Sequence, residues 1–91
     1  MKTFKDLVFE PHGIGYGYQA VLNFDNGYGV SVLLGDLFYS NGIDTYELGV
    51  LKKGHLCYDT PITDDVLGYL NKGEVTKIME KIQKLSRYEE S

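Results

Sequence analysis

The chain has one cysteine, one arginine and no long apolar run, and each of these shortages argues against a class of protein. Cys57 alone cannot form an intramolecular disulfide, and residues 1–6 lead into no signal-peptide core, so we expect a reducing cytoplasm. No apolar stretch approaches the roughly 20 residues of a membrane-spanning helix, so we expect no membrane insertion.

Positive charge is also scarce. Nine Lys and Arg stand against 13 Asp and Glu, which gives a net charge of -4, and Arg87 is the single arginine. Arginine is the side chain best suited to bidentate phosphate and guanine contacts, and an acidic chain repels a phosphate backbone. We therefore expect no direct binding to nucleic acid.

What remains is the composition of one small folded domain. A 43% hydrophobic and 13% aromatic content in 91 residues supplies an apolar core and argues against disorder. We expect a single domain over residues 1–85 and a polar C-terminal tail over residues 86–91.

Alternating apolar and polar residues predict most of the strands. This period of two covers residues 18–24 and 28–34, and Asn26-Gly27 between them suits a type I′ hairpin turn. A second hairpin is expected from residues 46–50 and 55–59 around Lys52-Lys53-Gly54. Residues 3–10 before Pro11 predict a short strand. Residues 35–45 predict a loop with partly exposed aromatic side chains, as binding loops often have.

Two helices are expected at the C-terminal end. Thr63 followed by Asp64-Asp65 suits the start of a short helix that carries Val66, Leu67 and Leu70. Asn71 and Glu74 have the spacing of a capping box for a second helix, whose apolar face is Val75, Ile78, Met79, Ile82 and Leu85. The fold class predicted is α+β, an antiparallel sheet of four to five strands in a hairpin meander followed by two helices on one face.

Three glycines alternate with larger residues at Gly13, Gly15 and Gly17. Such a run brings backbone N–H groups close to an anion, although it lacks the GxGxxG spacing and the following helix of a nucleotide loop. Two interpretations stay open: a bulged or twisted edge strand, and a loop that binds a ligand.

His55, Cys57 and Asp59 are spaced by two, so on a strand they share one face. That arrangement suits a facial metal site or a thiol beside an imidazole, but the same alternation is typical of a short edge strand. We expect the structural role, with no metal and no cofactor. Because no nucleophile with an adjacent base and no carboxylate pair is evident, we expect no enzyme.

Tyrosines and acidic residues are the most unusual content of the chain. Tyrosine offers a large contact area with few rotors, so tyrosines on a sheet face without helices suit a partner surface or a dimer seam. Core filling and cross-strand pairing are the commoner role of such tyrosines, and both interpretations stay open. The candidate partner-binding residues are Tyr16, Tyr18, Tyr28, Tyr39 and Tyr46 as anchors, with Asp36, Asp44 and Glu47 as a charged rim.

Several segments resemble a family of small uncharacterised proteins of tailed bacteriophages. They are residues 3–7 (TFKDL), Pro11-His12, residues 26–30 (NGYGV) and residues 58–66 (YDTPITDDV). The resemblance implies a phage context and the host-cell cytoplasm, where small acidic proteins often bind host machinery, including defence systems. It transfers no functional residue.

These observations predict a non-enzymatic accessory protein that binds and modulates a host or phage protein, with a homodimer as one form. The alternative is a protein that binds or sequesters a nucleotide or other anion through Gly13, Gly15 and Gly17, at a subunit interface in one version.

Overall fold

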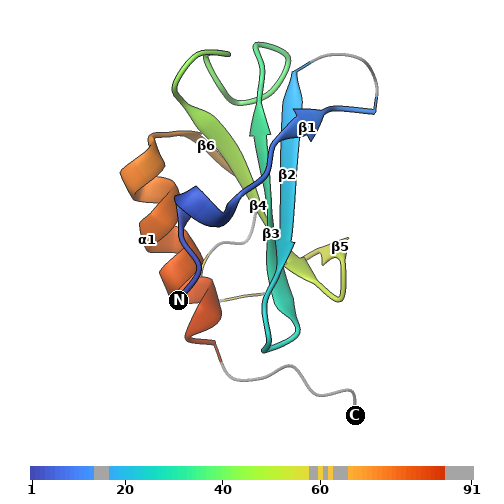
Figure 1. Ribbon diagram of the computed structural model, residues 1–91, viewed down its shortest axis with the longest axis vertical. Helices are drawn as coiled ribbons and strands as arrows, with labels where there is room; N and C mark the ends of the chain where they lie inside the picture. The colour runs from blue at the N-terminus through green and yellow to red at the C-terminus, as the bar shows by residue number, and fades with distance from the viewer. Residues whose placement is uncertain (14–16, 58–59, 61, 63–65, 86–91) are drawn as a thin grey trace.

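One helix packs on one face of an antiparallel sheet in the computed structural model, which describes residues 1–13, 17–57, 60, 62 and 66–85 (Figure 1). A 3₁₀ turn, η1 (Phe4–Asp6), comes first. It is followed by the strands β1 (Glu10–Pro11), β2 (Tyr18–Asn23), β3 (Tyr28–Leu34), β4 (Tyr46–Lys52), β5 (His55–Leu56) and β6 (Leu67–Leu70), and by the helix α1 (Lys72–Gln83).

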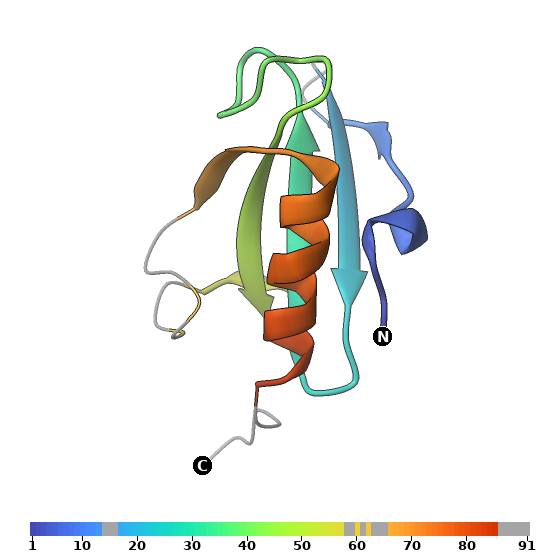
Figure 2. The ribbon, with the colours of Figure 1, turned by 90° about the vertical axis from the view of Figure 1, so that its left-hand side faces the viewer.

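The sheet has the order β1-β2-β3-β4-β5, and every pair is antiparallel. β6 also pairs with β4, along the part of β4 that β5 leaves free. The antiparallel α+β fold is therefore confirmed, but the described residues form six strands where four to five were predicted, and one C-terminal α-helix where two were predicted. Figure 2 shows α1 lying across the middle of the sheet, with the N-terminal segment beyond β2.

Both predicted hairpins are present, although the turn of the first differs from the prediction. Gly27 has a positive φ of 87° and Asn26 does not, so residues 24–27 do not form a type I′ turn. Both central residues of the second hairpin, Lys53 (φ 52°) and Gly54 (φ 82°), lie in the left-handed region that this turn requires. The turn type predicted at Asn26-Gly27 is therefore found at Lys53-Gly54.

The first predicted helix is wrong, because its described part is the strand β6. Leu67 pairs with Leu48 and Leu70 pairs with Tyr46, so three steps along β6 match two along β4. The extra residue is a β-bulge, and it turns both leucines toward the face that carries α1. Leucines three apart suit a helix equally well, which explains the error. The predicted cap at Thr63, Asp64 and Asp65 lies outside the described residues.

The strand predicted over residues 3–10 is also wrong for most of its length. The Asp6 carboxylate accepts the backbone N–H of Thr3 at 2.8 Å, and the Asp6 N–H donates to the Thr3 carbonyl at 2.9 Å. These bonds close a turn in place of a strand. Only Glu10 and Pro11 pair with β2.

The core lies between α1 and the sheet. Its fully buried side chains are Val30, Val32, Leu48, Val50, Val75, Met79 and Ile82. The predicted capping box is confirmed: the Glu74 N–H donates to Asn71 Oδ1 at 2.8 Å, and the Asn71 N–H donates to Glu74 Oε1 at 3.0 Å. No described helix has the length and apolar character to cross a membrane.

Candidate interaction surface

The tyrosines of the strands do not lie on the face without a helix, which corrects the predicted tyrosine-rich surface. Tyr46 is 5% exposed in the core, with its ring centroid 5.1 Å from that of Phe4 and 5.7 Å from that of Phe9. Tyr28 is half-buried against the same cluster. Tyr18, the first residue of β2, points to the same side of the sheet as buried Ala20, which is the helix side, and is 50% exposed. Tyr16 lies outside the described residues.

The other predicted anchor and the acidic residues gather at one end of the molecule. Tyr39, Asp36 and Asp44 belong to the loop of residues 35–45 between β3 and β4, and Glu47 follows at the start of β4. Glu47 Oε1 accepts the backbone N–H of Tyr39 at 3.2 Å. The structure therefore brings together Tyr39, Asp36, Asp44 and Glu47, whereas Tyr28 and Tyr46 turn their side chains into the core.

Two side chains fix the backbone of this loop. Buried Ser40 donates its hydroxyl to the Thr45 carbonyl at 2.5 Å and accepts the N–H groups of Gly35 and Gly42. Asn41 Oδ1 accepts three successive backbone N–H groups at 2.9–3.0 Å, those of Ile43, Asp44 and Thr45. These bonds satisfy five backbone N–H groups and one carbonyl of the loop, and so favour one loop conformation.

The fixed loop nevertheless presents large apolar side chains to solvent. Ile43 is 79% exposed, Leu37 63% and Tyr39 58%. Phe38, between two of them, points the other way, because its ring lies 5.2 Å from that of His12 and contacts the backbone at Gly17 and Gly35. One aromatic residue thus anchors the loop while its neighbours face outward.

β6 adds a fourth exposed residue, Tyr69, through its bulge. The Tyr69 N–H donates to the Tyr39 carbonyl at 2.8 Å, and the two rings lie 6.5 Å apart. Tyr69 has a positive φ of 56° and is 60% exposed. A tyrosine in this conformation is strained, and such outliers gather at functional sites. We name Leu37, Tyr39, Ile43 and Tyr69 the apical surface.

Sequence reasoning missed Leu37, Ile43 and Tyr69 as members of this surface. Gly68 was the available signal for Tyr69, because a glycine inside a predicted helix is unfavourable. An added Cβ at Gly68 would lie 2.6 Å from the Tyr39 Cβ, so the glycine lets β6 approach the loop. No local signal distinguishes outward Leu37 from inward Phe38.

The described glycines of the predicted ligand loop have different surroundings. Gly17 has a φ of 67°, and a Cβ there would meet the Leu34 carbonyl oxygen, so close packing requires it. Gly13 has nothing near its Cβ position, and Gly15 lies outside the described residues. A hollow of about 300 Å³ beside Gly17 has the Asp36 carboxylate as its charged group, which disfavours an anion.

The predicted alternative at β5 finds no support in the described residues. His55 is exposed and Cys57 is 7% exposed, with its N–H donated to the Val50 carbonyl at 2.8 Å, while Asp59 lies outside the described residues. Within the described ranges, no group of three His, Cys, Asp or Glu residues is placed to hold a metal.

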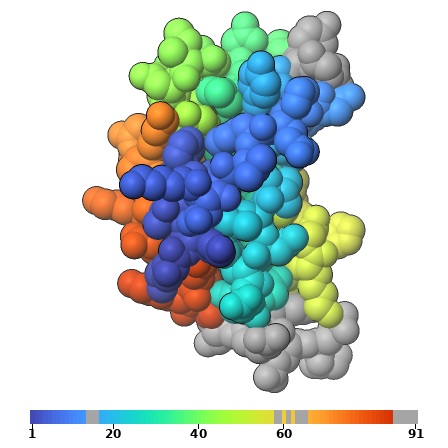
Figure 3. Space-filling model, viewed as in Figure 1, coloured from blue at the N-terminus to red at the C-terminus, as the bar shows by residue number. Residues whose placement is uncertain are grey.

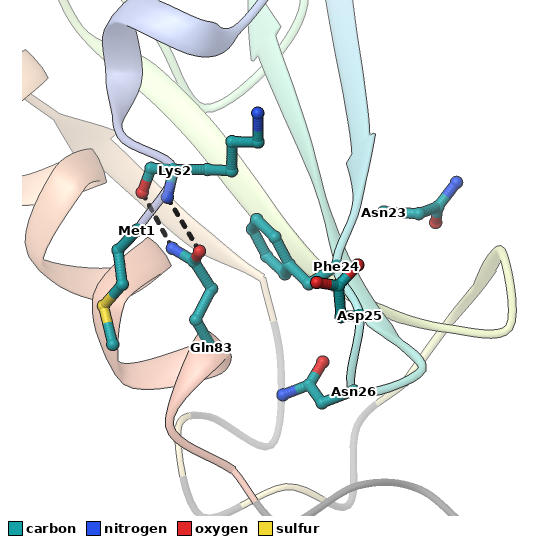
Figure 4. Close-up of a pocket in the computed structure, with 7 residues that line it drawn as sticks. All are labelled: Met1, Lys2, Asn23, Phe24, Asp25, Asn26 and Gln83. Atoms are coloured by element: carbon teal, nitrogen blue, oxygen red, sulfur yellow. Dashed lines mark hydrogen bonds between the residues drawn. The ribbon is translucent and has the colours of Figure 1, made fainter.

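Two further hollows lie away from the apical surface. One, of about 380 Å³, lies on the sheet face opposite α1, where exposed Val21 and Leu56 border small residues at Ser31 and Gly49. The other, of about 400 Å³, lies between the N-terminus, the first hairpin turn and the end of α1 (Figure 4). There the Gln83 amide bonds both backbone groups of Lys2, at 2.8 and 2.7 Å.

Comparison of this chain with family models, with curated proteins and with solved structures finds no match.

Proposed function

We propose that this chain is a non-enzymatic protein-binding module that uses its apical surface to occupy a partner protein. The observation that carries the proposal is that exposed apolar side chains stand on a loop whose backbone is held by hydrogen bonds. Ile43, Leu37 and Tyr39 are more than half exposed on a loop whose backbone Ser40 and Asn41 hold in place. An exposed apolar group costs solubility, and its retention on an ordered loop is typical of an interaction site.

The order of the loop favours tight binding. A flexible loop loses conformational entropy when it binds, whereas a loop that is already fixed loses little. Tyr39 and Tyr69 lie side by side and suit the role of anchors, because tyrosine combines a large apolar area with few rotors. The strain at Tyr69 is consistent with a side chain held outward for binding.

Charge indicates the chemistry of the partner. Asp36 and Asp44 flank the apolar residues, and residues 35–51 contain no lysine, arginine or histidine. An acidic rim around an apolar centre complements an apolar hollow with a basic rim. We therefore expect the association rate to fall as salt is added, because screening weakens the attraction between the rims.

The resemblance to proteins of tailed phages supports a partner from the host or the phage, met in the host cytoplasm. Modulation then follows from occupation: a partner surface covered by this module is closed to its other ligands. Interference with a host defence protein is one form of that action. This part of the proposal rests on the resemblance alone and names no target.

A site-specific crosslinker tests the proposal. A photoreactive residue is placed at position 43 in one protein and at position 56, on the far sheet face, in another. Both proteins are activated in host cells, and the crosslinked partner is identified, purified and titrated with Ile43→Asp, Leu37→Asp and the matched control Leu56→Asp.

We expect the two loop variants to weaken binding at least about tenfold, since a buried charge in place of an apolar anchor costs more than 1.4 kcal/mol. The Leu56→Asp protein should bind like the wild type, and circular dichroism should show three folded proteins. Equal weakening by all three, or loss of binding through Leu56→Asp alone, would place the interface elsewhere and overturn the proposal.

A further inference from the structure

We infer that the outer edge of β2, over residues 21–23, pairs with the same edge of a second copy of this chain. β1 covers only the first part of this edge, where Glu10 pairs with Gln19 and Pro11 with Tyr18. Beyond Gln19 the chain of residues 1–9 leaves the plane of the sheet and crosses toward the helix side (Figure 1). In the described part of the chain, no strand pairs with the outer side of residues 20–23.

The direction of the backbone groups follows from one hydrogen bond in the turn. The Phe24 N–H donates to the Tyr28 carbonyl at 2.7 Å, so Phe24 faces β3. The backbone N–H and C=O groups of successive residues point to opposite sides of a strand. Those of Leu22 and Ala20 therefore point toward β3, as those of Phe24 do, and those of Val21 and Asn23 point away from β3. Gly17 fits this alternation, because its carbonyl accepts the His12 N–H on the outer side. The free edge therefore offers the N–H and C=O groups of Val21 and Asn23.

This edge lacks the usual protection against strand pairing. Proteins protect an open edge with lysine, proline or a bulge, whereas residues 20–23 are Ala-Val-Leu-Asn and pair regularly with β3. Val21 is 52% exposed and lines a hollow of about 240 Å³ together with Val8, which is 74% exposed. Figure 3 shows the light-blue atoms of β2 at the surface, between the N-terminal segment and the yellow β5 hairpin.

The length of the free edge favours a second copy over a longer foreign strand. Four residues, 20–23, lie between the positions paired with β1 and the turn that begins at Phe24, and among them Val21 and Asn23 turn their backbone groups outward. When two such edges run antiparallel with Leu22 opposite Leu22, Val21 of each copy faces Asn23 of the other. Both of these pairs exchange N–H···O bonds in each direction, so the backbone groups turned outward are satisfied on both chains.

The resulting assembly is closed. A two-fold axis through Leu22 uses the same surface on both copies, so no edge remains to recruit a third chain. The two sheets join into one, and Val21 of each copy becomes a diagonal neighbour of Val21 in the other, which covers part of the apolar surface of both side chains. The apical surface takes no part in this pairing, so dimer formation and partner binding are separate properties.

Sedimentation of the full chain from micromolar to millimolar concentration tests the inference, with a variant that removes a single outward donor. In Val21→Pro the N–H that faces the second copy is lost, whereas the bonds from β2 to β3 stay intact. Val21→Thr keeps that N–H in a side chain of similar shape and is the matched control. Val21→Lys keeps the N–H but places like charges on neighbouring positions across the two-fold axis. Ile43→Asp changes the apical surface and leaves the β2 edge intact, so it tests whether the apical surface contributes to the dimer.

We expect the wild type, Val21→Thr and Ile43→Asp to form dimers with similar dissociation constants. The dissociation constant should rise at least about tenfold in Val21→Pro and in Val21→Lys. If Val21→Pro fails to fold, amide hydrogen exchange of the wild type decides, because the Val21 and Asn23 amides must gain protection as the concentration rises. A wild type that stays monomeric, amides that gain no protection, or dimers unaffected by both Val21→Pro and Val21→Lys would overturn the inference.

Discussion

Asn26, in the turn of the first hairpin, donates its Nδ2 to the carbonyl of Ile82 in the last turn of α1, at 2.8 Å. The same amide reaches the Leu85 carbonyl at 3.2 Å, and Asn26 Oδ1 accepts the Tyr28 N–H at 3.1 Å. The last carbonyls of a helix have no partner inside the helix. A residue 56 positions away in the sequence thus caps α1 and joins the helix to the sheet.

Replacement of Asn26 should destabilise the fold, because the Ile82 and Leu85 carbonyls lose a hydrogen-bond donor. Asn26→Ala removes the side-chain donor of both carbonyls, of which that of Ile82 keeps the Leu85 N–H at 3.1 Å, and should lower the free energy of unfolding by about 1–3 kcal/mol. Asn26→Asp keeps the shape and the Tyr28 bond but sets a negative charge beside the negative end of the helix dipole, so it should cost at least as much. Urea denaturation checks both, with exposed Asn23→Ala as the control. An Asn26→Asp protein as stable as the wild type would contradict the capping role.

Tyr46 should make the fold sensitive to alkali. Burial, and next the Asp44 carboxylate, raise the pKa of the Tyr46 phenol above its ordinary value of 10.0. The unfolded chain then loses this proton at a lower pH than the folded one, so the folded state binds more protons above pH 10.0. The stabilisation is fully present below pH 10.0 and is lost as the pH rises through the folded pKa.

Urea midpoints between pH 8 and 11.5 measure this effect. Tyr46→Phe preserves the ring contacts with Phe4 and Phe9 and should flatten the alkaline fall in stability. Asp44→Asn should make the alkaline fall smaller, because it removes the smaller cause of the raised pKa and so brings the folded pKa closer to the unfolded one. Tyr69→Phe, at a 60% exposed position, should change nothing. If stability falls with pH as steeply in Tyr46→Phe as in the wild type, another group causes the alkaline loss of stability.

The sequence predicted the parts of the fold that depend on local periodicity. Residues that alternate over 18–34 identify both strands of the first hairpin, and Asn71 with Glu74 identifies the start of α1. β6 was not predictable in this way, because Leu67 and Leu70 have a spacing that suits a helix and also a bulged strand. Only the pairing with Leu48 and Tyr46, a long-range contact, decides between them.

The candidate site was predicted in part for similar reasons. Residues 35–45 were recognised as a loop with exposed aromatic character, and Tyr39, Asp36 and Asp44 lie there. Tyr28 alternates in step with Val30 and Val32, which is a sequence signal that its side chain faces the core. Tyr69 joins the surface through a bulge and a positive φ, neither of which the sequence states.

Tyr69 should show a conflict between stability and binding. A tyrosine at φ 56° is strained, and glycine adopts that conformation without penalty. Tyr69→Gly should therefore raise the free energy of unfolding by about 1 kcal/mol, while the loss of the exposed ring weakens partner binding. Tyr69→Val, which is β-branched, should destabilise the fold. Thermal denaturation of the two variants checks the order, and a Tyr69→Gly protein less stable than Tyr69→Val would contradict the strain.

Asn41 should govern the order of the binding loop more than the stability of the fold. Its Oδ1 accepts three backbone N–H groups, and its Nδ2 donates to the Asp44 carboxylate at 2.7 Å. Asn41→Ala releases all four bonds on an exposed loop, so hydrogen exchange at Ile43, Asp44 and Thr45 should accelerate at least about tenfold while the core amides change little. Asn41→Asp keeps the acceptor and should retain most of the protection at these amides.

If partner affinity falls in Asn41→Ala although every apical side chain is unchanged, the loss measures the entropy that the fixed loop saves on binding. Faster exchange with unchanged affinity would show instead that the partner does not depend on the order of this loop.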